Sequence, residues 1–538
     1  MNNPSPIILE PKYYLSNFMT LLHSVEELYG DLLDTSERNW LHRFYQLEED
    51  EQCLLIRMMT RKGEWFRSDK LIYPELGATE PLLSKLELSG FIVLTLPSSP
   101  HILADKLLTK PELLSLYPDL PKALRKSQLI ERLPEQFESP TLSLPFTPIE
   151  LVDNDKLPLF CLLFFGNRHQ DFAQFVLENL GIHTFEQYEV STKTRIFHSR
   201  NEIISSLTLG ELAASYEEID RKSQQALQDF SKLIPMPQGK HASRTYNKLV
   251  NLVARDLERV GAFDDAFALF IQTVTPPSRE RQARILKAQA KLESAQKIVQ
   301  TMLESPLSID EFEVAERLSA PLCKALGKPK PKAVKLLPPE VHRKLDLSSN
   351  RVELAVVKAL NKEGWQAFYL ENQFLNTLFG LAFWDILFAP VEGAFVNPYQ
   401  RQPLDLYRKE FVESRKQLVE NRLNDIRLQG ISCLIDRHKN KRGIQNPFVV
   451  WELLDDSWLN LAMESISSDQ LIGLFEVILS DIRAYRAGQP DVVAFKDGDW
   501  MWCEVKGPGD KLQHNQIRWM KQFEKLNICY QVCYVNHR

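Results

Sequence analysis

The sequence predicts a multidomain, mostly helical protein that ends in a small α/β domain. Its 538 residues exceed the size of a typical single domain. Residues 207–326 show the apolar pattern of consecutive helical hairpins. Near the C-terminus, two β-rich runs flank Asp497-Gly498, the strongest short signal for a β-hairpin. Charged residues make up 25 % and hydrophobic residues 44 %, which is typical of a globular protein.

The net charge and the cysteine pattern exclude several classes of protein. The formal net charge of −6 argues against a general polyanion binder, so any nucleic-acid surface has to be local. The seven cysteines are scattered and form no Cys-x-x-Cys pair, so we expect neither a disulfide framework nor a zinc site. The N-terminus lacks the features of a signal peptide. The most apolar window, residues 368–388, contains acidic and amide side chains, which favours a buried helix over a membrane span.

Residues 1–103 are predicted to form a helical domain, with helices over residues 13–29, 38–47 and 51–61. A basic segment, Arg61-Lys-Gly-Glu-Trp-Phe-Arg67, follows them, with Arg61, Lys62 and Arg67 as candidate DNA contacts. Basic residues interleaved with aromatic ones can hold a DNA backbone and stack on bases. A basic turn between two helices explains the segment equally well, so both interpretations stay open.

Residues 104–205 are predicted to hold two short helices and a winged-helix-like element over 157–188. Thr109 and Glu112 have the spacing of a capping box, and a second helix is expected near Ser127. The basic link between these helices supplies further candidate DNA contacts: Lys122, Arg125 and Lys126. The pair resembles the SAP DNA-binding module, in which helix N-termini bind phosphate. A plain helical hairpin is the alternative.

Residues 206–330 are predicted to form a tetratricopeptide-like array. The segment 257–266 matches 286–295 in kind, with small residues at corresponding positions where antiparallel helices must approach closely. The usual period is about 34 residues, and such an array is normally a scaffold. Residues 331–345 are interpreted as a basic linker, because the stretch before and into it is rich in lysine and proline.

The predicted C-terminal hairpin brings two acids together. If Asp497 and Gly498 form the turn, Asp491 lies opposite Glu504, and Lys506 projects from the same face as Glu504. Opposed side chains lie about 5 Å apart at Cβ, where like charges are destabilising. A divalent cation with oxygen ligands, Mg²⁺ or Mn²⁺, would compensate. The arrangement is typical of a metal-dependent phosphodiesterase, and a solvated ion-pair cluster is the alternative.

The residues after the hairpin are predicted to form a turn, a helix capped by Asp510 and a last strand over 528–535. Basic residues exceed acidic ones in this segment, which suits a phosphate backbone. Candidate DNA contacts are Lys511, Gln516 and Arg518.

Two long motifs carry a family resemblance. Gln489-Pro-Asp-Val and Glu504-Val-Lys-Gly-Pro-x-Asp-x-Leu-x-x-x-Gln-x-x-Trp519 resemble the virus-type replication-repair nuclease domain, a branch of the PD-(D/E)xK nucleases. Within that branch the whole chain resembles the Fanconi-associated nuclease family. The segment 371–388 resembles the family pattern that carries its third acid, which falls on Glu371 of a helix predicted over 365–388. Alternatively, Glu371 lies in an exposed first turn and complements the helix dipole.

The resemblance implies a nuclease domain over 346–538 with a helical insertion over 390–485. It further implies a site for one or two Mg²⁺ or Mn²⁺ ions formed by Glu371, Asp491, Glu504 and the Val505 carbonyl, with Lys506 positioning the attacking water. The implied activity is structure-selective cleavage of 5′ flaps and branched DNA, with 5′-to-3′ exonuclease action, in interstrand crosslink repair by a monomer.

Two departures from animal members accompany the resemblance. The N-terminus has no Cys/His cluster, so the ubiquitin-binding zinc finger is not expected, and a bacterial, cytoplasmic protein is favoured over a nuclear one. Asn515 stands where animal members carry a lysine of the 5′-phosphate pocket, which puts strict dependence on that phosphate in doubt. The competing interpretations are a dimeric Holliday-junction resolvase or restriction-type nuclease and a DNA-binding scaffold with a vestigial nuclease domain.

Overall fold

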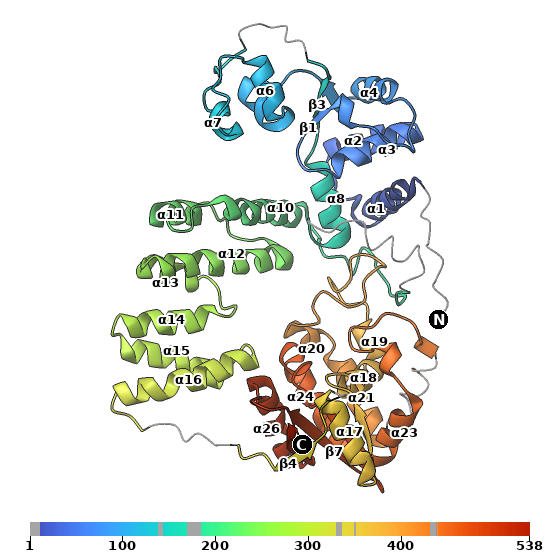
Figure 1. The fold of residues 1–538 in the computed structure, drawn as a ribbon, viewed down its shortest axis with the longest axis vertical. Helices are drawn as coiled ribbons and strands as arrows, with labels where there is room; N and C mark the ends of the chain where they lie inside the picture. The colour runs from blue at the N-terminus through green and yellow to red at the C-terminus, as the bar shows by residue number, and fades with distance from the viewer. Residues whose placement is uncertain are drawn as a thin grey trace. The chain divides into compact units, whose positions relative to one another are not determined.

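The structure, a computed structural model, describes residues 11–137, 144–168, 184–329, 336–348, 351–430, 437 and 440–537. The chain divides into two compact units, Met1–Ile182 and His183–Arg538 (Figure 1). No helix within the described ranges combines the length and apolar character needed to cross a membrane.

The first unit combines helices with a small sheet. The helices are α1 (Tyr13–Tyr29), α2 (Thr35–Tyr45), α3 (Glu49–Met59), α4 (Thr79–Leu88) and α8 (Lys156–Phe165). The antiparallel strands β1 (Trp65–Arg67), β2 (Ile92–Leu94) and β3 (Pro148–Leu151) pair in the order β1-β3-β2. The first three predicted helices are confirmed. Helix α2 begins earlier than expected because Asp34 and Glu37 form a capping box.

The two short helices predicted after residue 104 are confirmed as α6 (Lys110–Leu116) and α7 (Lys126–Ile130), which follow α5 (Pro100–Ile102). The predicted capping box starts α6, since Glu112 Oε2 accepts the backbone N–H of Thr109 at 2.7 Å. Buried leucines give these helices an apolar cluster of their own. The winged-helix-like element expected over 157–188 is described only in part, because residues 169–183 lie outside the described ranges.

The second unit starts with helical hairpins, as predicted (Figure 1). They are α10 (Arg200–Ser215), α11 (Gln224–Lys232), α12 (Gly239–Arg259), α13 (Phe263–Phe270), α14 (Ser278–Ala288), α15 (Leu292–Glu304) and α16 (Ile309–Ala325). Ala266 and Ala295 are fully buried, which fits close helix packing. Gly261 and Ala290 instead have φ values of +86° and +58° and lie in the turns that follow α12 and α14. These two small residues therefore lie in chain reversals and not in helix contacts, and only at Gly261 does a missing Cβ ease the left-handed conformation.

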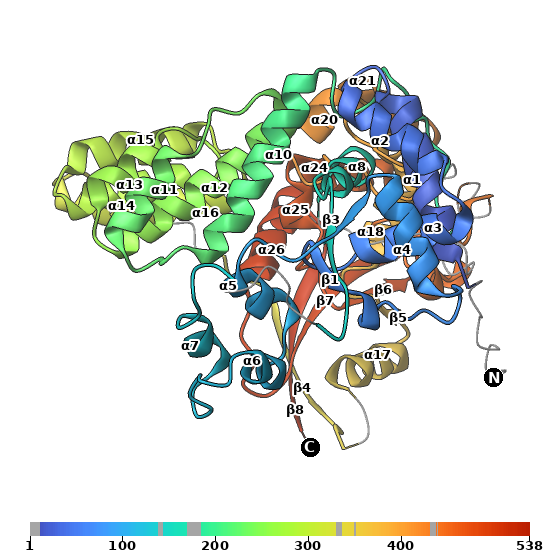
Figure 2. The same ribbon diagram turned by 90° about the horizontal axis from the view of Figure 1, so that it is seen from above.

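The C-terminal domain of this unit is built on a five-stranded sheet in the order β4-β8-β7-β6-β5. The strands are β4 (Glu340–Leu345), β5 (Gln366–Tyr369), β6 (Val492–Lys496), β7 (Asp499–Lys506) and β8 (Tyr530–His537). Helix α17 (Val352–Lys362) covers one face over alternate residues such as Ala494 and Cys503 (Figure 2). The opposite residues, including Phe495 and Trp502, join the larger helical core.

The helices of that larger core surround the other face of the sheet. They are α18 (Phe374–Ala382), α19 (Trp384–Leu387), α20 (Glu410–Ser414), α21 (Lys416–Gln429), α23 (Asp456–Ser465), α24 (Ser468–Ser480), α25 (Ile482–Tyr485) and α26 (His514–Leu526). The helices between α19 and α25 in the chain form the helical insertion that was expected.

The predicted hairpin register is confirmed. Phe495 pairs with Trp500, and Val492 pairs with Cys503. Asp497 and Gly498 have φ values of +51° and +85°, the left-handed pair that a type I′ turn requires.

Two predicted boundaries are wrong. Residues 340–345, expected within a linker, form β4 and pair in parallel with β8, and their charged side chains suit a sheet edge. Residues 331–335 of the linker lie outside the described ranges. The single helix expected over 365–388 is instead β5 followed by α18 and α19. Gly364, at φ +89°, follows the end of α17, and the aromatic run after it pairs with β6.

Candidate active site

Asp491 and Glu504 lie together at the end of the hairpin, as predicted. Asp491 directly precedes β6, and Glu504 is the next residue of β7 after the last registered pair, Val492 and Cys503. The backbone N–H of Val505 donates to Asp491 Oδ2 at 2.8 Å, which fixes this carboxylate against β7. Asp491 is 8 % exposed and Glu504 is 1 % exposed. Two carboxylates are therefore held side by side out of solvent.

Their electrostatics reflect this confinement. The pKa of Asp491 is raised to about 6, mainly by burial and in part by the charge of Glu371, while the Val505 N–H opposes the rise. Burial and the charge of Asp491 together raise the pKa of Glu504 to about 8, although Lys506 opposes this. The charge of Lys506 alone does not compensate for the charges of both acids.

Lys506 completes the cluster, and a residue from α26 joins it. Lys506 is buried, with Nζ 2.9 Å from Glu504 Oε1. Gln516, expected to contact DNA, instead donates from Nε2 to Glu504 Oε1 at 2.6 Å. The prediction that Asp510 caps α26 is wrong, because the helix begins at His514 and Asp510 accepts the backbone N–H of Gly507.

Glu371 lies at the rim of this cluster, on a turn and not on the predicted helix. The backbone N–H of Leu370 donates to the Asp491 carbonyl at 3.0 Å. This hydrogen bond places the backbone of the next residue, Glu371, close to Asp491. Its side chain is exposed and accepts the Tyr369 hydroxyl at 2.9 Å. Of the two interpretations of Glu371, an exposed residue in a turn fits the structure better than an acid on a buried helix.

An amide network holds this turn to the Asp491 segment. Asn372 Oδ1 accepts the backbone N–H of Gln489, and Asn376 Oδ1 accepts Gln489 Nε2, both at 3.0 Å. Asn376 also donates to the Asn372 carbonyl at 2.7 Å. Asn372 adopts φ +53°, a conformation that asparagine tolerates better than most residues. These hydrogen bonds fix the backbone segment that carries Glu371 relative to the segment that carries Asp491.

The chemistry of the acidic residues in this cluster suits a hard divalent cation. Glu504 Oε2 is buried and has no hydrogen-bond partner within the described part of the chain, so one carboxylate oxygen is available to a ligand. All candidate donors are oxygens, which Mg²⁺ and Mn²⁺ prefer. Glu371, however, turns toward Tyr369, and among the described residues no three His, Cys, Asp or Glu side chains lie at metal-ligand spacing. The structure therefore brings together Asp491, Glu504 and Lys506 but not all three acids.

The raised pKa values predict how the metal-free protein responds to pH. Both acids have folded-state pKa values above their unfolded ones, so the protonated forms stabilise the fold. This stabilisation is fully present below about pH 4 and is lost as pH rises through about 6 and 8. We expect the free energy of unfolding in EDTA, measured by denaturant titration, to fall across this range. In the double variant Asp491→Asn, Glu504→Gln the fall should be smaller; an equal fall would contradict the assignment.

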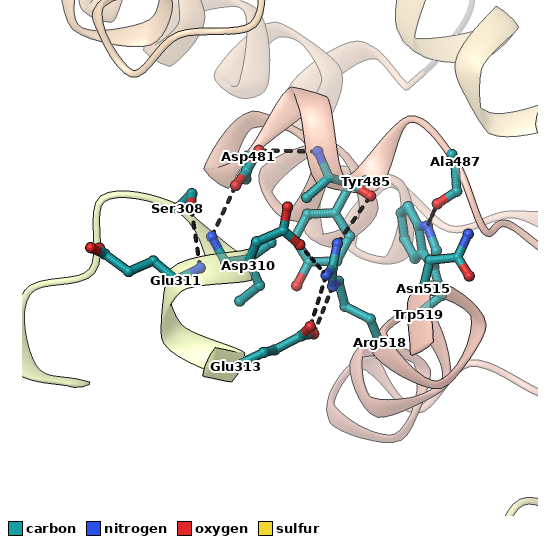
Figure 3. A network of polar contacts seen from close by, with 12 residues as sticks. Ser308, Asp310, Glu311, Glu313, Asp481, Tyr485, Ala487, Asn515, Arg518 and Trp519 are labelled. Atoms are coloured by element: carbon teal, nitrogen blue, oxygen red, sulfur yellow. Dashed lines mark hydrogen bonds and ion pairs between the residues drawn. The ribbon is translucent and has the colours of Figure 1, made fainter. Parts of the chain in front are cut away.

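Two of the residues predicted to contact DNA form ion pairs within the protein. Arg518 is 8 % exposed and forms a two-pronged ion pair with Glu313, at 2.8 and 2.9 Å, and a third contact with Asp310 at 2.6 Å (Figure 3). It joins α26 to the first turn of α16. Arg67 pairs with Asp69 and Glu112 and so joins β1 to α6. Both guanidinium groups are engaged by carboxylates, which favours a structural role for these two residues over the predicted DNA contact.

The other candidate DNA contacts stay predictions. Five of them are exposed: Arg61, Lys62, Lys122, Arg125 and Lys511. Lys126 donates to the Asp105 carbonyl at 3.0 Å on the surface of the first unit.

A cluster of arginines was not predicted. Burial and the nearby charges of Arg244 and Arg483 lower the pKa of Arg408, while Glu410 and Asp405 oppose this. Burial also lowers the pKa of Arg244. None of the three forms an ion pair with another described residue, which suits an anion. These residues come from α12, the insertion and α25, so no local pattern in the sequence indicates them.

Comparisons with known proteins agree with the geometry. Residues 12–93 match the family described as FAN1, HTH domain, and residues 429–537 match the VRR-NUC domain. A Fanconi-associated nuclease 1 homolog of Pseudomonas aeruginosa is 34 % identical over 99 % of this chain and 97 % of its own length. Human Fanconi-associated nuclease 1 is 24 % identical, and the match covers 63 % of that longer protein.

Two solved structures match nearly the whole chain. A crystal structure of paFAN1 bound to 2nt 5′flap DNA with gap has a TM-score of 0.84 at 32 % identity and covers 99 % of this chain and 100 % of that one. A crystal structure of paFAN1 bound to 1nt 5′flap DNA with gap has a TM-score of 0.82 at 32 % identity, with 98 % and 100 % covered.

Proposed function

The chain belongs to the Fanconi-associated nuclease family, and from this premise we propose that it is a metal-dependent nuclease that cleaves DNA at 5′ flaps and related branches. The observation that carries the proposal is the buried pair Asp491 and Glu504, beside Lys506, in which one carboxylate oxygen has no partner among the described residues. The flap DNA in the two similar structures supports the substrate class.

Each residue of the cluster has a role in this proposal. Asp491 and Glu504 would hold Mg²⁺ or Mn²⁺, with Glu371 from the adjacent turn and the Val505 carbonyl as further ligands. The bound ion would polarise the phosphodiester and lower the pKa of water. Lys506, whose ammonium is held 2.9 Å from Glu504, would orient the attacking water or a phosphate oxygen. Burial of these groups strengthens their electrostatic interaction with the substrate.

The arginine cluster extends the proposal to the DNA backbone. Arg244, Arg408 and Arg483 would bind a phosphate of the flap strand, since planar guanidinium groups suit phosphate oxygens. Asn515 contributes no positive charge there, so we propose that a 5′-terminal phosphate strengthens binding without being required. We further propose 5′-to-3′ exonuclease action, a role in interstrand crosslink repair and a monomeric, cytoplasmic enzyme of a bacterium.

A cleavage assay on four DNAs tests this function. End-labelled 5′-flap, 3′-flap, four-way-junction and plain duplex DNA would be incubated with the protein and Mn²⁺ or Mg²⁺. We expect the 5′ flap to be cut fastest, near the branch, with no cutting in EDTA. Symmetric cutting of the four-way junction would favour a resolvase, and a solution mass of twice the chain would support that result. Binding without cleavage of any DNA would favour the scaffold.

A further inference from the structure

Gln516 makes three polar contacts inside the catalytic cluster. Its Nε2 donates to Glu504 Oε1 at 2.6 Å. Its Oε1 accepts Lys506 Nζ at 3.0 Å and the backbone N–H of Gln513 at 2.8 Å. Because Lys506 also contacts Glu504 Oε1 at 2.9 Å, the three side chains close a ring of hydrogen bonds. This ring joins the carboxylate and the ammonium to the first turn of α26.

The amide has one orientation that satisfies all three contacts. Flipping it would place its oxygen against the Glu504 carboxylate and its NH₂ group against the Lys506 ammonium and the Gln513 N–H. Each of those pairings is repulsive. Glutamate at this position would lack the donor to Glu504, and methionine would lack both donor and acceptor. The site therefore requires the donor and acceptor of an amide in this order.

The ring decides which oxygen of Glu504 is available. Gln516 and Lys506 both use Oε1, whereas Oε2 is buried and has no partner within the described part of the chain. Rotation of the carboxylate would break both contacts. We propose that Gln516 is a positioning residue of the catalytic site, which presents Glu504 Oε2 to the cation and holds Lys506 in place, and is not a DNA contact. This inference rests on the proposed function.

Packing of α26 supports a fixed position for Gln516. Trp519 Nε1 donates to the Ala487 carbonyl at 3.2 Å, and Arg518 anchors the helix to α16 (Figure 3). Trp519 is fully buried. Both contacts lie within one turn of Gln516, so the amide is carried by a rigid element, as a residue that orients catalytic groups requires.

The test is Gln516→Met, which keeps the side-chain length and removes the hydrogen bonds. Mn²⁺ affinity would be measured by calorimetry on the full chain without DNA, and 5′-flap affinity by fluorescence anisotropy in EDTA. We expect the Mn²⁺ dissociation constant to rise about 10- to 100-fold, as for other partners of metal ligands, and flap affinity to stay unchanged. Gln522→Met is the matched control on the same helix, since Gln522 contacts the Tyr485 hydroxyl.

Wild-type Mn²⁺ affinity in Gln516→Met, with weakened flap binding, would overturn the inference and restore Gln516 as a DNA contact. If Gln516→Met does not fold, Gln516→Asn serves instead, because it keeps the amide but shortens its reach by one methylene. It should also bind Mn²⁺ more weakly, and an unchanged dissociation constant would overturn the inference. Failure of the wild-type protein to bind Mn²⁺ would instead refute the proposed function, and the positioning role with it.

Discussion

Glu504→Gln is expected to reduce Mn²⁺-dependent cleavage of a 5′ flap by about 1,000-fold or more, since an ion that stabilises the transition state by several kcal/mol would lose a ligand. The side chain keeps its size and stays buried. At pH 7 without metal, the variant should be more stable than the wild type by about 3 kcal/mol, because glutamine does not have to be protonated to be buried. Single-turnover kinetics and denaturant titration measure the two effects.

The opposite signs make this prediction specific. A variant that merely damages the fold loses activity and stability together, whereas Glu504→Gln should lose activity and gain stability. Flap binding in EDTA should match the wild type. Loss of stability in EDTA, or cleavage within about tenfold of the wild type, which corresponds to only 1.4 kcal/mol, would contradict the assignment of Glu504.

Arg518→Ala is expected to destabilise the second unit by about 3 kcal/mol, the usual cost of removing one partner of a buried ion pair. The hydrogen bonds that Arg518 donates to Glu313 raise the pKa of Arg518, and Asp310 adds to this, so the charged form is strongly favoured in the fold. The variant leaves Glu313 without its cation and loosens α26 against α16 (Figure 3). Thermal and denaturant unfolding of the full chain measure the loss.

Lys521→Ala is the matched control, because Lys521 is exposed on the same helix. Its effect should stay within about 0.5 kcal/mol. The charge-exchanged double variant Arg518→Glu, Glu313→Arg should recover part of the loss. If Arg518→Ala keeps wild-type stability and instead weakens DNA binding, the original expectation of a DNA contact is correct and the structural role is refuted.

The part of the site that could be predicted from the sequence depends on short-range rules. A two-residue turn and the alternation of a strand determine which residues of a hairpin oppose each other. Those rules place Asp491 beside Glu504 and put Lys506 on the same side. The structure shows this pair and its lysine, and the family comparison agrees with the same segment.

The misassigned parts depend on pairings between distant segments. The aromatic residues before Glu371 suit either a helix or a strand, and only the pairing of β5 with β6 decides between them. Basic residues look alike in sequence whether they face phosphate or acids. Arg67 pairs with Glu112 and Arg518 with Glu313, both on other elements, while Arg244 and Arg408 form no ion pair with a described residue although Glu410 and Asp405 lie near them. Local charge counts could not separate these cases.

The most direct test is cleavage of an end-labelled 5′ flap with Mn²⁺ by the wild type and by Asp491→Ala at equal protein concentration, with flap binding measured in EDTA. We expect cutting near the branch by the wild type, none by Asp491→Ala or in EDTA, and equal flap binding by both proteins. Equal cleavage by the two proteins, or cleavage by the wild type in EDTA, would contradict a metal-dependent site built on Asp491 and Glu504.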